Sequence, residues 1–168
     1  MDVAFILLGA ILVTYGWYWG GVTETRTTAY ALGAASFMFG LWFAFSGGAG
    51  NDAIGGTMLA FGSVYGLLAA ANAWNESAQD RTYGMFALLF AVGAFFSFTQ
   101  LSEAGTAAQY GYGALVAGVT FGLHFISAAL IPVNRGFKNF VGWLTLIAGA
   151  ALVLFGFAET LGWDFGTF

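Results

Sequence analysis

Long apolar stretches separated by short polar clusters divide the chain into six segments. The segments cover residues 3–21, 28–46, 54–74, 83–101, 110–131 and 140–161. Each has about 19 to 22 residues, which is enough, at a helical rise of 1.5 Å per residue, to cross a hydrocarbon layer about 30 Å thick. The pattern predicts an all-α integral membrane protein, a single bundle of six transmembrane helices that occupies residues 1–168.

Composition supports lipid as the solvent. Of the 168 residues 60% are hydrophobic and 7% are charged, whereas a soluble domain has about 25% charged residues. Four Lys and Arg residues are too few to neutralise a run of phosphates, which argues against nucleic-acid binding. The first segment lacks a basic start and a cleavage site of small residues, so we expect a retained helix and not a signal peptide.

Basic residues predict the orientation. Loops between the first and second, third and fourth, and fifth and sixth segments carry all of them, namely Arg26, Arg81, Arg135 and Lys138. Since Lys and Arg in short loops stay in the cytoplasm, both termini are predicted to lie outside. The expected location is the plasma (inner) membrane. The spacing also suggests three helical hairpins that turn on these loops. The alternative is that any six-helix protein with this topology has basic loops at about this period.

Small residues and terminal aromatics predict how the helices pack and sit in lipid. The pairs Gly16/Gly20, Gly62/Gly66 and Gly118/Gly122 have the small-xxx-small spacing of close helix contacts. Aromatic residues at segment ends are typical of interfacial belts. These are Trp17, Trp19, Trp74, Tyr110, Tyr112, Trp143 and Trp163.

Few residues are candidates for catalysis or metal binding. With no cysteine, one histidine and no carboxylate pair deep in a helix, the chain lacks the means for a catalytic triad, a metal site or an acid/base dyad, and we predict that it is not an enzyme. We also expect no cofactor. His124 falls within the fifth segment, and an ionisable residue at that depth usually faces the bundle interior or a water-filled path. The alternative is a neutral imidazole bonded to a neighbouring helix. Glu159, near the end of the last segment, is expected to reach water.

Phe61 and Tyr65 lie one helical turn apart in the third segment. An aromatic ring and a phenol at that spacing can form a narrow throat that passes small uncharged solutes and rejects hydrated ions. The same residues would also suit an ordinary core.

Several stretches, in the same order along the chain, resemble the AmiS/UreI family of urea and short-chain amide channels. They are Gly9 to Val13, the loop Val22 to Ala29, Phe61-Gly62-Ser63-Val64-Tyr65, Arg81-Thr82-Tyr83 and Phe140 to Leu144. The resemblance implies a homo-hexamer with a pore in each protomer and both termini outside. It implies that pore residues include Phe5, Leu8, Leu12, Phe61 and Tyr65.

The chain also departs from that family. Positions lined by tryptophan in members that pass urea match Ala117, Thr120 and His124, and a glutamate of the family matches Ala148. Acid-gated members have a long, histidine-bearing second loop, whereas residues 47–53 contain Asp52 and no histidine. Gating by that device is therefore not expected, and a solute other than urea remains open.

A second resemblance competes. Residues 140–150, followed by Glu159, are similar to the last helix of the acetate/succinate transporter family, but its asparagine-proline-alanine signature is missing. The sequence therefore predicts a passive channel for a small uncharged solute such as urea or a short-chain amide, surrounded by membrane lipid. The alternatives are an acetate or short-chain monocarboxylate channel or transporter, and a non-conducting accessory subunit of a larger membrane complex.

Overall fold

Six long helices make up almost all of the computed structural model, which describes residues 2–46, 53–75, 80–103, 107–158 and 160–167. Each helix is long and apolar enough to cross a membrane, as the hydropathy pattern predicts. A π-helical segment, η1, directly continues α5. The elements are α1 Asp2–Trp19, α2 Thr25–Ser46, α3 Ala53–Asn75, α4 Asp80–Glu103, α5 Ala108–Phe125, η1 Ile126–Leu130 and α6 Arg135–Gly156.

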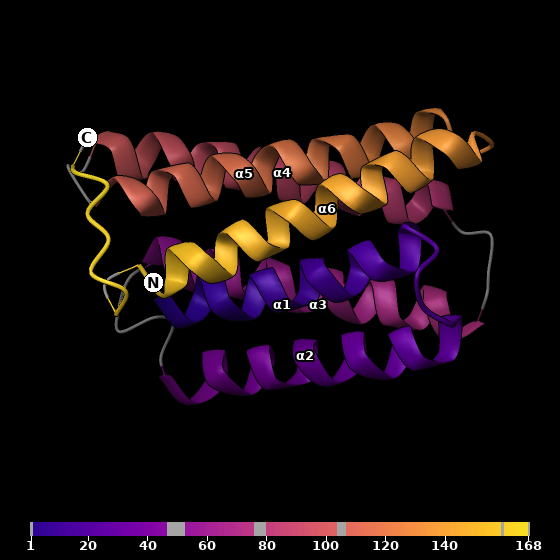
Figure 1. The fold of residues 1–168 in the computed structure, drawn as a ribbon, viewed down its shortest axis with the longest axis horizontal. Coiled ribbons are helices and arrows are strands. Elements are labelled where there is room, and N and C mark those ends of the chain that lie inside the picture. The colour runs from indigo at the N-terminus through magenta and orange to yellow at the C-terminus, as the bar shows by residue number, and fades with distance from the viewer. Residues whose placement is uncertain (1, 47–52, 76–79, 104–106, 159, 168) are drawn as a thin grey trace.

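The helices lie roughly side by side, with α1 in the middle, α2 at one edge and α6 crossing α1 (Figure 1). Both termini lie at the same end of the bundle (Figure 1). There, the Tyr110 hydroxyl donates to Asp2 Oδ1 at 2.7 Å, and the Ala108 N–H donates to the Gly166 carbonyl at 2.8 Å. The termini thus share one side, as predicted, and the side of the membrane they face stays a prediction.

The helix pairs with the most extensive packing are not the expected hairpins. The most extensive packing joins α1 with α6, α4 with α5 and α2 with α3. The pairs joined by the basic loops also touch, but less extensively. The closest sequential pairs therefore turn at the end of the bundle that holds the termini, while α1 and α6 join the two ends of the chain.

The last helix begins and ends about one turn earlier than hydropathy predicts. Asn134 caps it, with its side-chain oxygen accepting from the Phe137 N–H at 3.0 Å. Arg135 and Lys138 consequently belong to the first turn and not to the loop. The 140–161 prediction was wrong here because an apolar run does not mark the cap. Glu159 and residues 47–52, including Asp52, lie outside the described residues.

Backbone contact between glycines defines the α1/α6 seam. A Cβ added at Gly16 would lie 2.6 Å from the Leu146 nitrogen, and one at Gly149 would lie 2.6 Å from the Val13 nitrogen. The glycines recur every seven residues on each helix, which keeps them on one face. They are Gly9 and Gly16 of α1 with Gly142, Gly149 and Gly156 of α6.

Most glycines of the predicted small-xxx-small pairs lie against a neighbouring helix. Gly62 meets Phe39 of α2, Gly66 meets Ser36 of the same helix, and Gly118 meets Phe95 of α4. Gly122 instead faces open space, with nothing within 4 Å of an added Cβ. The α6 glycines of the closest seam were missed, because their spacing of seven does not match the four-residue motif.

Candidate functional site

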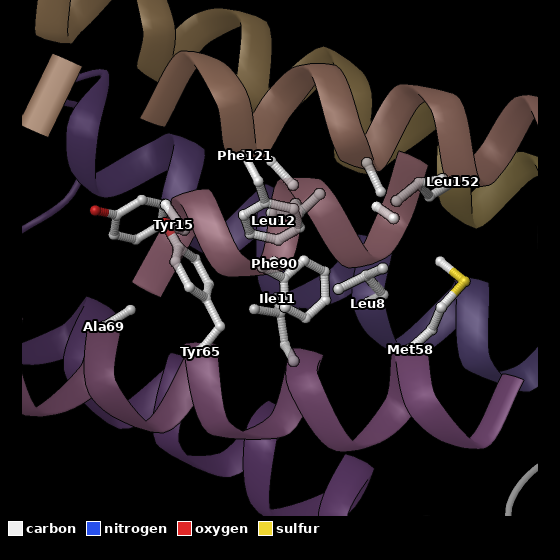
Figure 2. Close-up of a cluster of buried hydrophobic side chains, with 14 of the residues drawn as sticks. Leu8, Ile11, Leu12, Tyr15, Met58, Tyr65, Ala69, Phe90, Phe121 and Leu152 are labelled. Carbon is white, nitrogen blue, oxygen red and sulfur yellow. The ribbon is translucent and has the colours of Figure 1, made fainter. Parts of the chain in front are cut away.

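The interior of the bundle gathers most of the residues predicted to line a pore. Seven of them are buried, whereas Phe61 is 44% exposed. In Figure 2, Leu8 and Leu12 of α1 lie with Tyr65 of α3 and Phe121 of α5 in the space between the helices. The seven buried residues are Phe5, Leu8, Leu12, Tyr65, Ala117, Thr120 and His124.

His124 links three helices through hydrogen bonds. Its Nδ1 bonds to the hydroxyl of Tyr65 in α3, and its Nε2 lies 2.6 Å from Oγ1 of Thr145 in α6. The Thr145 hydroxyl in turn donates to the Val141 carbonyl at 2.7 Å. The imidazole is fully buried, so both of its nitrogens find partners inside the protein, as buried polar groups require.

The direction of this chain of hydrogen bonds follows from proton counting. Thr145 has one hydroxyl proton, and the Val141 carbonyl can only accept it. Nε2 of His124 therefore carries the proton that it donates to Thr145. No carboxylate is buried among the described residues, and an unpaired buried cation is costly. The imidazole is accordingly neutral, and its Nδ1 accepts from Tyr65.

Aromatic rings surround His124, and we call them the aromatic collar: Tyr15, Trp19, Tyr65, Tyr83 and Phe121. The imidazole centroid lies 4.8 Å from the Trp19 ring, 5.0 Å from Tyr15 and 5.8 Å from Phe121. Tyr83 completes the collar, 4.9 Å from the ring of Tyr65 and 5.7 Å from that of Tyr15. Four helices, α1, α3, α4 and α5, thus contribute to one aromatic enclosure.

Trp19 is the collar member that sequence places wrongly. It ends α1 and was assigned to an interfacial belt, yet it is only 3% exposed. Its indole Nε1 is buried with no hydrogen-bond partner in the part of the chain that the structure describes. The Lys138 ammonium lies 4.9 Å from the centroid of its ring. Trp19 therefore contacts both His124 and the first turn of α6, and its one hydrogen-bond donor is unused.

Phe61 lines a hollow beside the collar and not the axis of the bundle. This hollow, of about 220 Å³, lies between α3 and α4 and also borders Tyr65 and Phe90. Phe61 meets Phe90 edge to face at 5.8 Å, and Phe90 lies 4.1 Å from Phe121. Its link to the collar is therefore indirect.

The same seam is hollow at both sides of Phe61. Towards the basic loop, a hollow of about 350 Å³ includes Asn72, Asn75 and Thr82 and shares Leu68 and Phe86 with the central one. Towards the end with the termini, a much smaller one is lined by Thr57 and Ser97, among others. The α3/α4 seam is thus polar at its ends and apolar between them.

The remaining predicted pore residues make few polar contacts with other helices. Phe5 stacks on Tyr110 with ring centroids 6.0 Å apart. The Thr120 hydroxyl donates to the Val116 carbonyl of its own helix at 2.8 Å, and Thr120 borders an α5/α6 hollow of about 380 Å³ together with Ala148. Among the described residues no group of three or more His, Cys, Asp or Glu could hold a metal ion.

Sequence reasoning missed Tyr15, Tyr83 and Thr145. Tyr15 and Trp19 lie four residues apart and therefore share a helix face, which is a usable signal. Thr145 offers no such signal, because its role depends on which face of α6 meets His124.

Among the comparisons with known proteins, a solved structure shows the fold. No family model and no curated protein sequence matches the chain. The crystal structure of the urea channel from the human gastric pathogen Helicobacter pylori matches with a TM-score of 0.69 at 18% sequence identity, over 96% of this chain and 98% of that one. The chain therefore has the six-helix fold of that channel, as the resemblance implied, and is a multi-pass membrane protein.

Proposed function

We propose that the protein is a passive channel for a small uncharged solute, such as urea or a short-chain amide, and not an enzyme. The observation that carries the proposal is the structural likeness to a urea channel over nearly the whole length of both chains. No cofactor and no energy coupling are required, because the solute moves down its own gradient.

The chemistry of the interior supports an uncharged solute. Carboxylate, Lys and Arg side chains are absent from the buried positions that the structure describes, so an ion entering the bundle would lose its water without a compensating charge. A small amide instead needs only a donor and an acceptor. His124 and Trp19 place both inside an apolar enclosure.

The pathway we propose follows the predicted pore residues of α1, α3 and α5 to the aromatic collar. Phe5, Leu8 and Leu12 supply its apolar wall, with Ala117 and Thr120 opposite and Phe61 acting through Phe90. Rings of the collar lie in contact with one another. A solute therefore passes only when some of them turn aside, which restricts the channel to small molecules.

The proposal includes a homo-hexamer in the plasma (inner) membrane with both termini outside. Apolar side chains such as Phe45, Phe96 and Ile147 are largely exposed on the single chain, so lipid or a second copy must cover them. The basic loops support the orientation. Native mass spectrometry and cysteine labelling at Asp2 test the copy number and the orientation.

Stopped-flow light scattering on proteoliposomes tests the function. We expect urea and acetamide to enter much faster than into empty liposomes, and acetate to enter no faster. Passage of acetate alone would instead support a monocarboxylate channel or transporter. If none of the three enters faster than into empty liposomes, the protein is an accessory subunit that does not conduct. Val92→Ala, on the exposed face of α4, is the matched control.

A further inference from the structure

Two features around His124 exceed what a narrow throat requires. One is the Thr145 hydroxyl, which occupies Nε2 of His124 and is itself committed to the Val141 carbonyl. The other is the unused indole donor of Trp19. A buried polar group left unpaired is uncommon in native structures and calls for an explanation.

The Thr145 contact decides what the other face of the imidazole offers. Because Thr145 takes the Nε2 proton, Nδ1 is held as an acceptor, and the Tyr65 hydroxyl occupies it in this structure. A solute N–H group is a donor like the Tyr65 O–H. It can therefore replace the tyrosine without leaving the imidazole unpaired, provided that the Tyr65 side chain turns away.

Trp19 supplies the complementary contact. Its ring packs on the imidazole with centroids 4.8 Å apart and an interplanar angle of 36°, so its Nε1–H lies within the reach of one small molecule from His124. An acceptor and a donor on neighbouring rings are complementary to a group that bears an N–H and a carbonyl oxygen on the same carbon. A carboxylate lacks N–H and would direct lone pairs at Nδ1, which is repulsive.

We propose that His124 and Trp19 form a two-point recognition site for the primary amide group, in which Thr145 is the positioning residue that fixes the His124 tautomer. The solute donates its N–H to Nδ1 of His124 and accepts from Nε1–H of Trp19, and it displaces the Tyr65 hydroxyl. This inference rests on the proposed channel function and names the chemical class that the channel selects.

The single histidine of the chain gives the site a direct spectroscopic readout. The protein is labelled with ¹⁵N-histidine, held in nanodiscs and measured by NMR. Nε2 should be protonated and Nδ1 unprotonated. Added propionamide should shift the Nδ1 signal. Thr145→Val should yield a mixture of the two tautomers. Thr145→Ser keeps the hydroxyl and should preserve the wild-type spectrum. Trp19→Phe should leave the tautomer unchanged but reduce the shift on adding propionamide.

Flux of two isomers completes the test. Propionamide and N,N-dimethylformamide have the same atoms, but only propionamide has N–H groups. After subtraction of the empty-liposome rate, wild type should favour propionamide by about tenfold, the factor expected for one neutral hydrogen bond. Thr145→Val should lose most of that preference, Thr145→Ser should retain it, and Trp19→Phe should slow propionamide.

Each outcome separates the inference from the proposed function. A protonated Nδ1 in wild type, or a Thr145→Val protein with unchanged tautomer and preference, would overturn the recognition site even if urea flux is fast. The same holds if Thr145→Ser behaves like Thr145→Val. Conversely, absent flux combined with the expected tautomer and a propionamide-induced shift would support the site and refute the channel.

Discussion

The α1/α6 and α3/α4 seams show opposite packing in one bundle. Along α1 and α6, glycines bring the two backbones together so closely that added Cβ atoms would lie well within 3 Å of partner atoms, as at Gly16 and Gly149. Along α3 and α4, hollows of about 220 and 350 Å³ separate the helices. One seam is thus a fixed frame, and the other has room for side chains to turn.

The candidate site takes residues from both seams. Trp19, which would donate to the solute, and Thr145, which would fix the His124 tautomer, belong to the tight pair α1 and α6. Tyr65 and Tyr83 belong to the loose pair α3 and α4, where a displaced ring can be accommodated. Precise positioning therefore belongs to the tightly packed side and movement to the loosely packed side.

The largest effect is expected from filling the tight seam. Gly149→Ala places a methyl group 2.6 Å from the Val13 nitrogen, and backbone cannot yield as a flexible side chain would. We expect the free energy of unfolding to fall by about 3 kcal/mol, at the upper end of the usual overpacking range. A lower Tm in detergent would show this loss of stability. Gly122→Ala, which meets nothing within 4 Å, is the matched control. Equal Tm values for the two variants would contradict the tight seam.

The second effect concerns the acceptor. His124→Leu retains a buried side chain but removes Nδ1, so a solute N–H finds no partner. Urea permeability should fall by about tenfold or more, as expected for one lost buried hydrogen bond. Stopped-flow light scattering measures it, with Val92→Ala as the control. A His124→Leu protein that folds and conducts urea at the wild-type rate would show that the imidazole does not contact the solute.

A smaller effect of opposite sign is expected at the movable ring. Tyr65→Phe removes the hydroxyl that competes for Nδ1, so urea permeability should rise by about threefold, while stability falls by about 1 kcal/mol for the lost hydrogen bond. Tyr30→Phe, on an exposed ring of α2, controls for the loss of a phenol. Slower urea entry in Tyr65→Phe would mean that this hydroxyl binds the solute itself.

The smallest effect is expected in the hollow seam. Phe61→Ala enlarges a space that already exists and reaches the collar only through Phe90. The urea-to-acetamide permeability ratio should change by about twofold, which corresponds to about 0.4 kcal/mol. Leu89→Ala, in the same hollow, should change it less. A complete loss of selectivity in Phe61→Ala would move the throat from the axis to the α3/α4 seam.

Hydropathy predicted the spans well, because membrane thickness limits helix length whatever the helices pack against. It failed at α6, where the Asn134 cap and not the apolar run determines the start. Phe61 and Tyr65 show a second limit. They lie one turn apart, yet their exposed fractions are 44% and 2%, because the boundary between the α3/α4 seam and the interior passes between them.

His124 was predictable and its partners were not. An ionisable residue at membrane depth is expected to face the interior, and the structure shows the second of the two alternatives for it, an imidazole bonded to neighbouring helices. Thr145 and Trp19 join it only because α6 and α1 pack through glycines spaced by seven. Which helix faces meet is a tertiary property that local sequence does not encode.

The decisive measurement is the urea permeability of proteoliposomes that contain wild type, His124→Leu or Val92→Ala, determined by stopped flow on the same day. We expect rapid entry in wild type and Val92→Ala, and slow entry in His124→Leu. Wild-type entry no faster than into empty liposomes would contradict the claim that this six-helix bundle is a channel for a small amide-like solute.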